Sequence, residues 1–130
     1  MYNTNKYINI PFESHGRTFQ GCDCYGLVRL FLNNELGKNL PDFEDYINPK
    51  DREQIQNLII KNKPLISAKQ IDTPEEGCIA VFNIRHHPTH LGVYIGNNYI
   101  LHTMQGSNSL LEKIDSPRLR GRLEGFYEVR

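Results

Sequence analysis

The sequence predicts an α+β fold, with N-terminal helices packed on a small antiparallel sheet. Apolar residues recur at helical spacing in the first half of the chain, whereas from Gly77 onward they alternate as they do in strands. Helices followed by strands, rather than an alternation of the two, indicate an antiparallel sheet. The chain has 130 residues and no repeat or linker, so we expect a single domain over residues 1–130.

Two helices are predicted in the first half. The first spans residues 23–36: Asp23 is a residue type that caps helix N-termini, and Gly37 is a typical C-terminal stop. The second spans residues 49–62 and is ended by Pro64.

Four strands are predicted in the second half, over residues 78–83, 89–95, 99–104 and 125–129. Residues 96–98, Gly-Asn-Asn, mark a hairpin turn between the middle two. A two-residue loop would place Val93 opposite His102 and turn His90 to the other face. A loop of about three residues would place Gly92 opposite His102 and both histidines on one face. We predict the second arrangement, in which the two imidazoles are diagonal neighbours.

Composition excludes several classes of function. Lys plus Arg and Asp plus Glu each number 15, and no long basic run suggests binding to nucleic acid or to an anionic membrane. No stretch approaches the roughly 18 apolar residues of a membrane span, and the first twenty residues lack the apolar core of a signal peptide. We therefore expect synthesis as a cytoplasmic protein. Cys22 and Cys24 are separated by a single residue, too few for a typical structural zinc pair, so free thiols and no metal or cofactor are expected.

Cys24 is the candidate nucleophile because it stands at a predicted helix start. Free N–H groups and the positive end of the helix dipole favour a thiolate there, so we expect a lowered pKa. The alternative, a small buried residue of a core helix, stays open at this point.

Histidines that could complete a catalytic site lie downstream. His90 would take the thiol proton and return it to the leaving amine, and His102 would orient the His90 ring. This hypothesis requires a sulfur that solvent can reach and that lies within a bridging water of the rings. Residue types alone leave it open, since histidines of half-buried strands are often structural.

Three sequence blocks carry a more specific signal: DCYGL at residues 23–27, HLGVYIG at residues 90–96, and His102 twelve positions after His90. In this order and spacing they resemble the NlpC family of papain-like cell-wall cysteine peptidases. The resemblance implies a papain-like fold and a catalytic triad of Cys24, His90 and His102.

The resemblance also implies a substrate. Such enzymes cleave the stem peptides of peptidoglycan, typically between γ-D-glutamate and the diamino acid. The variants CDCYGLVR at residues 22–29 and ILH at residues 100–102 look most like peptidases of phage tail tips, which implies other tail proteins as partners and a place in a virion. Two alternatives remain: a catalytically weak tail-assembly protein with the same fold, and the same chemistry on another amide or thioester.

One position departs from the family pattern. The family usually has Tyr twelve residues before the nucleophile, and its hydroxyl is thought to help hold the oxyanion, but this chain has Phe12. Tyr7, His15 and Tyr25 are candidate substitutes. Further residues are interpreted as structural: Cys22 as an incidental thiol, Cys78 as core, and Arg118, Arg120 and Arg122 as a solvated or interaction-prone tail before the last strand.

Overall fold

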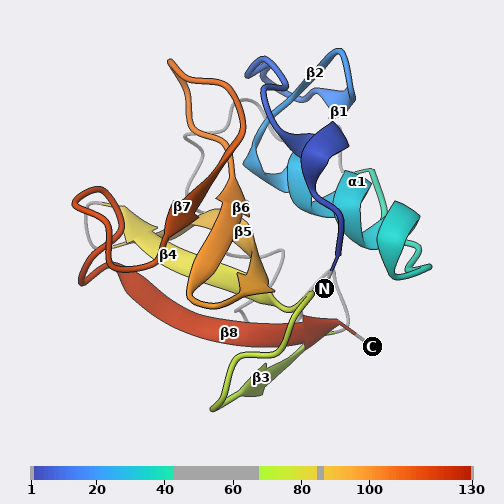
Figure 1. Cartoon of the computed structure of the whole chain (residues 1–130). Helices are drawn as coiled ribbons and strands as arrows, with labels where there is room; N and C mark the ends of the chain where they lie inside the picture. The colour runs from blue at the N-terminus through green and yellow to red at the C-terminus, as the bar shows by residue number, and fades with distance from the viewer. Residues whose placement is uncertain (1, 43–67, 85–86, 130) are drawn as a thin grey trace.

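The computed structural model describes residues 2–42, 68–84 and 87–129. The helix predicted over residues 49–62 lies outside these ranges. Within them the chain forms one α-helix and a six-stranded antiparallel sheet (Figure 1). The predicted α+β class is confirmed.

The main sheet has the strand order β3-β8-β4-β5-β6-β7. Its strands are β3 (Ala68–Ile71), β4 (Ile79–Ile84), β5 (His87–Gly96), β6 (Tyr99–His102), β7 (Leu110–Lys113) and β8 (Leu123–Val129). Four of them match the predicted strands. The edge strands β3 and β7 were not predicted, because each has only four residues and too little alternation to stand out from a loop.

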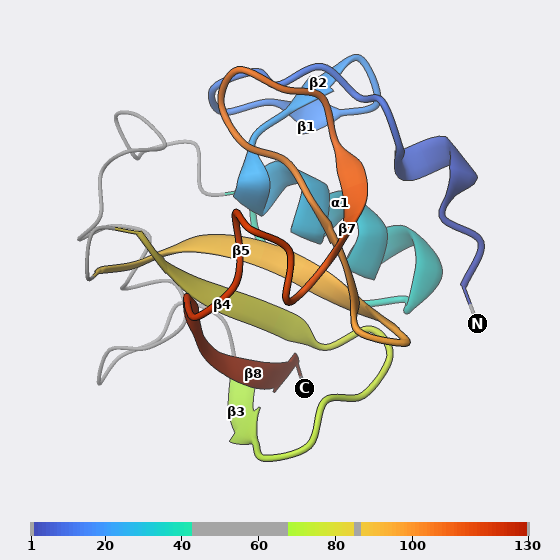
Figure 2. The same cartoon turned by 60° about the vertical axis from the view of Figure 1, so that its left-hand side comes forward.

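The helix α1 (Cys24–Glu35) confirms the first predicted helix. Its apolar face, including Leu27, Phe31 and Leu32, packs on one face of the sheet against residues of β4, β5, β6 and β8 (Figure 2). The opposite face forms a second core with Cys78, Phe82 and Leu119, the last contributed by the segment between β7 and β8. Cys78 is therefore a core residue, as predicted. Both faces of the central strands are thus buried.

The N-terminal segment packs along α1, with its 3₁₀ turn near the end of the helix and its small sheet near the start. It contains the 3₁₀ turn η1 (Asn5–Tyr7) and the two-stranded sheet of β1 (Arg17–Thr18) and β2 (Gly21–Cys22). An added Cβ at Gly26 would lie 2.0 Å from the carbonyl oxygen of Gly16, so only glycine lets this sheet approach α1 so closely. This packing gives a physical reason for the glycine of the DCYGL block.

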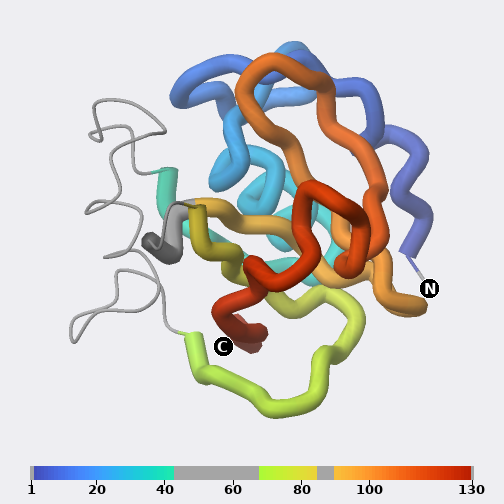
Figure 3. Tube along the Cα trace, turned by 90° about the vertical axis from the view of Figure 1, so that its left-hand side faces the viewer, coloured from blue at the N-terminus to red at the C-terminus, as the bar shows by residue number. Residues whose placement is uncertain are grey.

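A loop that follows β6 rises to meet this segment. The backbone N–H of Asn9 donates to the carbonyl of Ser109 at 2.8 Å, and that of Ser109 donates to Ile10 at 2.9 Å. Figure 3 shows the two stretches side by side, in blue and orange. Residues far apart in the sequence therefore form a common rim above α1.

The hairpin between β5 and β6 has the predicted offset, but by a different route. Asn97 and Asn98 both have positive φ, 53° and 67°, as a tight two-residue turn requires. The register then shifts by one residue between Tyr94 and Gly96, which is a β-bulge. The pair Val93↔Leu101 follows, so Gly92 lies opposite His102. The predicted three-residue loop is thus a two-residue turn plus a bulge.

In the described part of the chain, no helix is both long and apolar enough to span a bilayer.

Candidate active site

The start of α1 is fixed by a buried carboxylate. Asp23 is 1% exposed, and its Oδ1 accepts hydrogen bonds from the backbone N–H of Gly26 at 2.8 Å and from Arg17 at 3.0 Å. Its Oδ2 accepts the backbone N–H of His15 at 3.0 Å. The predicted cap is therefore confirmed. The same carboxylate also forms an ion pair with Arg17 and holds the loop at His15.

Cys24 occupies the first turn of this helix, beside β5. β6 has ended before the position opposite Leu91, and the backbone N–H of Leu91 is directed at the sulfur of Cys24 instead. The N-terminus of α1 thus lies at the edge of β5 where β6 has ended. The sulfur consequently lies next to the backbone of the residue that follows His90.

The electrostatics of Cys24 differ from the prediction. Burial raises the pKa of the thiol to about 12, Asp23 adds to the rise, and the N–H groups of Leu91 and Tyr25 oppose it. A helix dipole contributes about 0.3–1 kcal/mol, less than one pKa unit, whereas burial can shift a pKa by about 3–5 units. The prediction of a lowered pKa is therefore wrong for this structure, which holds a neutral thiol.

The two histidines are brought together as predicted. Nε2 of His90 and Nδ1 of His102 are 2.8 Å apart, and the two rings meet edge to face. Both lie on the sheet face away from the α1 core, where Phe82 contacts the His90 ring. Burial lowers the pKa of His90 to about 3, and it also lowers the pKa of His102. Both imidazoles are therefore neutral at pH 7.

Gly92 makes this pairing possible. A Cβ at this position would lie 2.5 Å from Cγ2 of Ile100 and 3.1 Å from Cβ of His102. The space that a side chain would need is taken by residues of β6, the strand carrying His102.

Glu112 extends the pair, and sequence reasoning missed it. Its Oε1 is 2.8 Å from Nε2 of His102 and 2.7 Å from Nη2 of Arg118. Arg118 was interpreted as part of a solvated or interaction-prone tail, but it is anchored to this carboxylate. The sequence held no periodic signal for either residue, because the contact depends on β7 pairing with β6.

The candidate triad is assembled in part. In the described residues no hydrogen bond joins Cys24 to either imidazole, and the sulfur is held by backbone groups. Cys24 is 7% exposed, and its sulfur lies beside the backbone N–H of Leu91, the residue that follows His90. Cys22 is fully buried, and burial raises its pKa to about 12, in line with an incidental thiol.

A groove of about 470 Å³ lies beside this site. Its lining comes from the two sides of the rim: Pro11, Phe12, Ser14, Gln105, Gly106, Ser107 and Asn108. Phe12 forms a β-bridge with Cys22, two residues before Cys24. In the sequence, one wall thus comes shortly before the candidate nucleophile, and the other comes shortly after His102.

The structure also ranks the substitutes for the missing tyrosine. The hydroxyl of Tyr7 donates to Glu35 at the far end of α1, and that of Tyr25 donates to the carbonyl of Pro41 at 2.5 Å. His15 instead has its backbone bound to Asp23, beside Cys24. The hydroxyls of both tyrosines are thus engaged away from the sulfur, which leaves His15 as the remaining candidate substitute.

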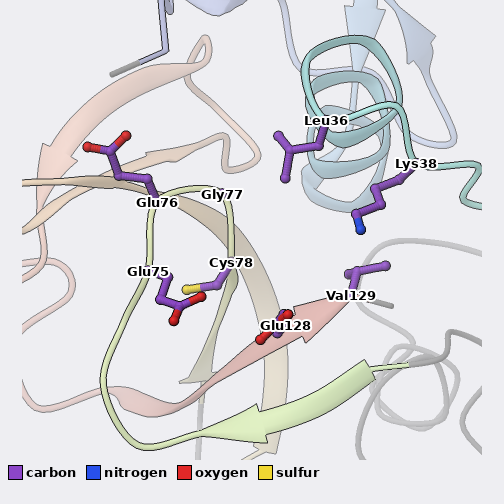
Figure 4. Close-up of a pocket in the computed structure, with 8 residues that line it drawn as sticks. All are labelled: Leu36, Lys38, Glu75, Glu76, Gly77, Cys78, Glu128 and Val129. Carbon is purple, nitrogen blue, oxygen red and sulfur yellow. The ribbon is translucent and has the colours of Figure 1, made fainter.

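A second cavity, of about 130 Å³, lies at the other end of α1. Figure 4 shows Leu36 and Lys38 from that end, across from the segment that carries Glu75, Gly77 and Cys78. Because Cys24 is at the opposite end of the helix, this cavity is not part of the candidate active site.

Comparison with known proteins identifies the family. The sequence profile described as the NlpC/P60 family matches residues 9–125. The chain belongs to the NlpC/P60 family. None of the curated proteins compared with it matches.

Two solved structures have similar folds. The NlpC/p60 domain of the peptidoglycan hydrolase SagA superposes with a TM-score of 0.64 at 14% identity, covering 98% of this chain and 92% of that one. An NLP/P60 family protein similar to a lipoprotein, from Staphylococcus aureus subsp. aureus Mu50, gives 0.62 at 18% identity, covering 95% of this chain and 38% of that one. At these identities the likeness establishes the NlpC/P60 fold.

Proposed function

We propose that this chain is a cysteine endopeptidase that cleaves peptidoglycan stem peptides. Cys24 is the nucleophile, His90 is the base and acid, and His102 orients His90. The observation that carries the proposal is that the Cys24 sulfur lies against the backbone N–H of Leu91, directly after His90, which is itself hydrogen-bonded to His102. Family membership and the likeness to a domain of a peptidoglycan hydrolase support the choice of substrate.

The reaction follows the usual course of a thiol hydrolase. His90 takes the proton of Cys24, and the thiolate attacks the peptide carbonyl. N–H groups at the start of α1 stabilise the oxyanion, because they carry no partner within the helix. The protonated His90 then supplies a proton to the leaving amine, and water hydrolyses the thioester.

The resting state must change before this reaction starts. A raised thiol pKa and a lowered imidazole pKa favour the neutral pair over the thiolate and imidazolium. Substrate binding therefore has to bring Sγ and the His90 ring into contact, which would stabilise the thiolate and the imidazolium together. The groove between Phe12 and the loop after His102 is where the peptide would lie.

The bond cleaved and the biological setting are finer parts of this proposal. Cleavage between γ-D-glutamate and the diamino acid is proposed from the family resemblance alone. A role in a phage or prophage tail is proposed from the CDCYGLVR and ILH variants, after synthesis in the cytoplasm. Mass spectrometry of purified tail particles would test the second part, since the chain's peptides should be present there.

The enzymatic proposal is tested with purified peptidoglycan. Wild type should release fragments with new amino termini on the diamino acid, detected by mass spectrometry, and Cys24→Ala should release none. Cys22→Ala is the matched control, because it removes a thiol two residues away and should keep the activity. Thermal unfolding of each variant checks that the fold is retained. Equal release by wild type and Cys24→Ala would reject a peptidase role.

A second candidate is a structural tail protein with weakened catalysis. It is favoured by the burial of Cys24 and by Phe12, which cannot donate a hydrogen bond. This candidate predicts no release by wild type and alkylation of Cys24 by iodoacetamide no faster than that of Cys78. A third alternative, cleavage of another amide or thioester, would appear as Cys24-dependent turnover in substrate profiling without cleavage of peptidoglycan.

A further inference from the structure

We propose that Glu112 is a positioning residue of this site, acting through His102 to determine which nitrogen of His90 can accept a proton. The proposal deepens the peptidase function and rests on it for its catalytic consequence. Its structural part, the placement of two protons, can be measured without any substrate.

Three donors hold the Glu112 carboxylate in place. Oε1 accepts from Arg118 at 2.7 Å and lies 2.8 Å from Nε2 of His102, while Oε2 accepts from the hydroxyl of Ser116 at 2.6 Å. Glu112 is on β7, opposite Ile100 of β6, so strand pairing brings it alongside His102. The side chain is 14% exposed, which limits competition from water.

These contacts keep the carboxylate ionised. Burial alone would raise the pKa of Glu112, but hydrogen bonds from Arg118, Ser116 and His102 hold it at about 2. An ionised carboxylate only accepts hydrogen bonds. His102 must therefore donate from Nε2.

The direction of the next hydrogen bond then follows. A neutral imidazole with a proton on Nε2 has a lone pair on Nδ1, so Nδ1 of His102 accepts from Nε2 of His90. His90 is neutral as well, which leaves Nδ1 of His90 as its unprotonated nitrogen. That is the nitrogen that can accept the thiol proton of Cys24.

Without the carboxylate this direction is lost. A glutamine at position 112 has nearly the same size but can donate as well as accept. His102 could then carry its proton on Nδ1, which would force His90 to accept at Nε2 and keep its proton on Nδ1. In that state His90 cannot act as a base toward Cys24.

The test reads the protons directly. Long-range ¹H–¹⁵N correlation spectra of labelled protein at pH 7 distinguish protonated from unprotonated imidazole nitrogens. In the wild type we expect an unprotonated Nδ1 and a protonated Nε2 in both histidines. In Glu112→Gln we expect a mixture of both forms. Glu128→Gln, a substitution at an exposed residue of β8, is the matched control and should keep the wild-type pattern.

Activity gives the second readout. We expect Glu112→Gln to lower kcat on peptidoglycan by about 10- to 100-fold with little change in KM, because the base and not the groove is affected. A protonated Nδ1 on wild-type His90, or an unchanged tautomer pattern in Glu112→Gln, would overturn the proposal. If Glu112→Gln does not fold, the wild-type spectrum still decides the first point. If wild type cleaves nothing but shows the expected pattern, the proton arrangement stands and the peptidase function fails.

Discussion

The two halves of the candidate site are built in opposite ways. The nucleophile half is local: Asp23 caps the helix that begins with the next residue, and the ion pair to Arg17 spans only six positions. The histidine half is assembled from β5, β6, β7 and the segment after β7, with Glu112 bound to His102 across a strand pair. Burial raises the pKa of the nucleophile, whereas a chain of hydrogen bonds fixes the protons of the histidines. A helix N-terminus alone therefore does not make a thiol reactive.

The largest effect should come from the base. His90→Gln keeps the approximate size of the side chain but removes the proton acceptor, so kcat/KM on peptidoglycan should fall by about 10²–10⁴-fold. Initial rates of fragment release measure the change. Thermal unfolding should show that the variant is folded. A rate of fragment release within twofold of wild type would mean that His90 is not the base.

In the nucleophile half, Arg17→Met should destabilise the protein by about 3 kcal/mol. The side chain of Arg17 is 7% exposed, and its loss leaves the buried Asp23 carboxylate without its ion-pair partner. Urea unfolding followed by circular dichroism measures this loss. Arg120→Met, at an exposed position, is the control and should change the free energy of unfolding by less than about 0.5 kcal/mol.

In the histidine half, Gly92→Ala should cost about 1–3 kcal/mol, because the added Cβ overlaps Ile100 and crowds His102. The matched control is Gly125→Ala, whose Cβ would be crowded only by the end of the flexible Gln70 side chain, with Tyr127 at an ordinary contact distance of 3.6 Å. Urea unfolding of both variants gives the comparison. Equal stability of the two would show that the close contact between β5 and β6 is not required.

Acid should lower the free energy of unfolding through the histidine half. The pKa of folded His90 is about 3, below its ordinary value of 6.5, so the unfolded state binds more protons between these values. The contribution of His90 to the free energy of unfolding should be complete above pH 6.5. It should fall as the pH drops toward 3, by at most about 1.4 kcal/mol per pH unit. Urea midpoints from pH 7 to 5 test the slope, and in His90→Gln the slope should be shallower.

The smallest expected effect is a gain. Phe12→Tyr restores the family's hydroxyl beside the groove, and we expect kcat on peptidoglycan to rise by up to about tenfold, less than the roughly hundredfold cost of losing an oxyanion donor outright. His15→Ala would show whether His15 has taken over this role, since it should then lower kcat. If neither substitution changes the rate, backbone N–H groups alone hold the oxyanion.

Local signals in the sequence determined the nucleophile half of this protein. Asp23 and Gly37 bound α1 because capping depends on a few neighbouring residues, and the central strands follow from alternation. The shared face of His90 and His102 was predicted as well, although the bulge that produces the required offset was not.

Only the tertiary structure decided the rest. The bulge before Gly96, the pairing of β7 with β6 and the contact of Arg118 with Glu112 depend on interactions between separate segments. The raised pKa of Cys24 likewise depends on what covers the sulfur, since desolvation is a property of the packed interior and not of the helix start.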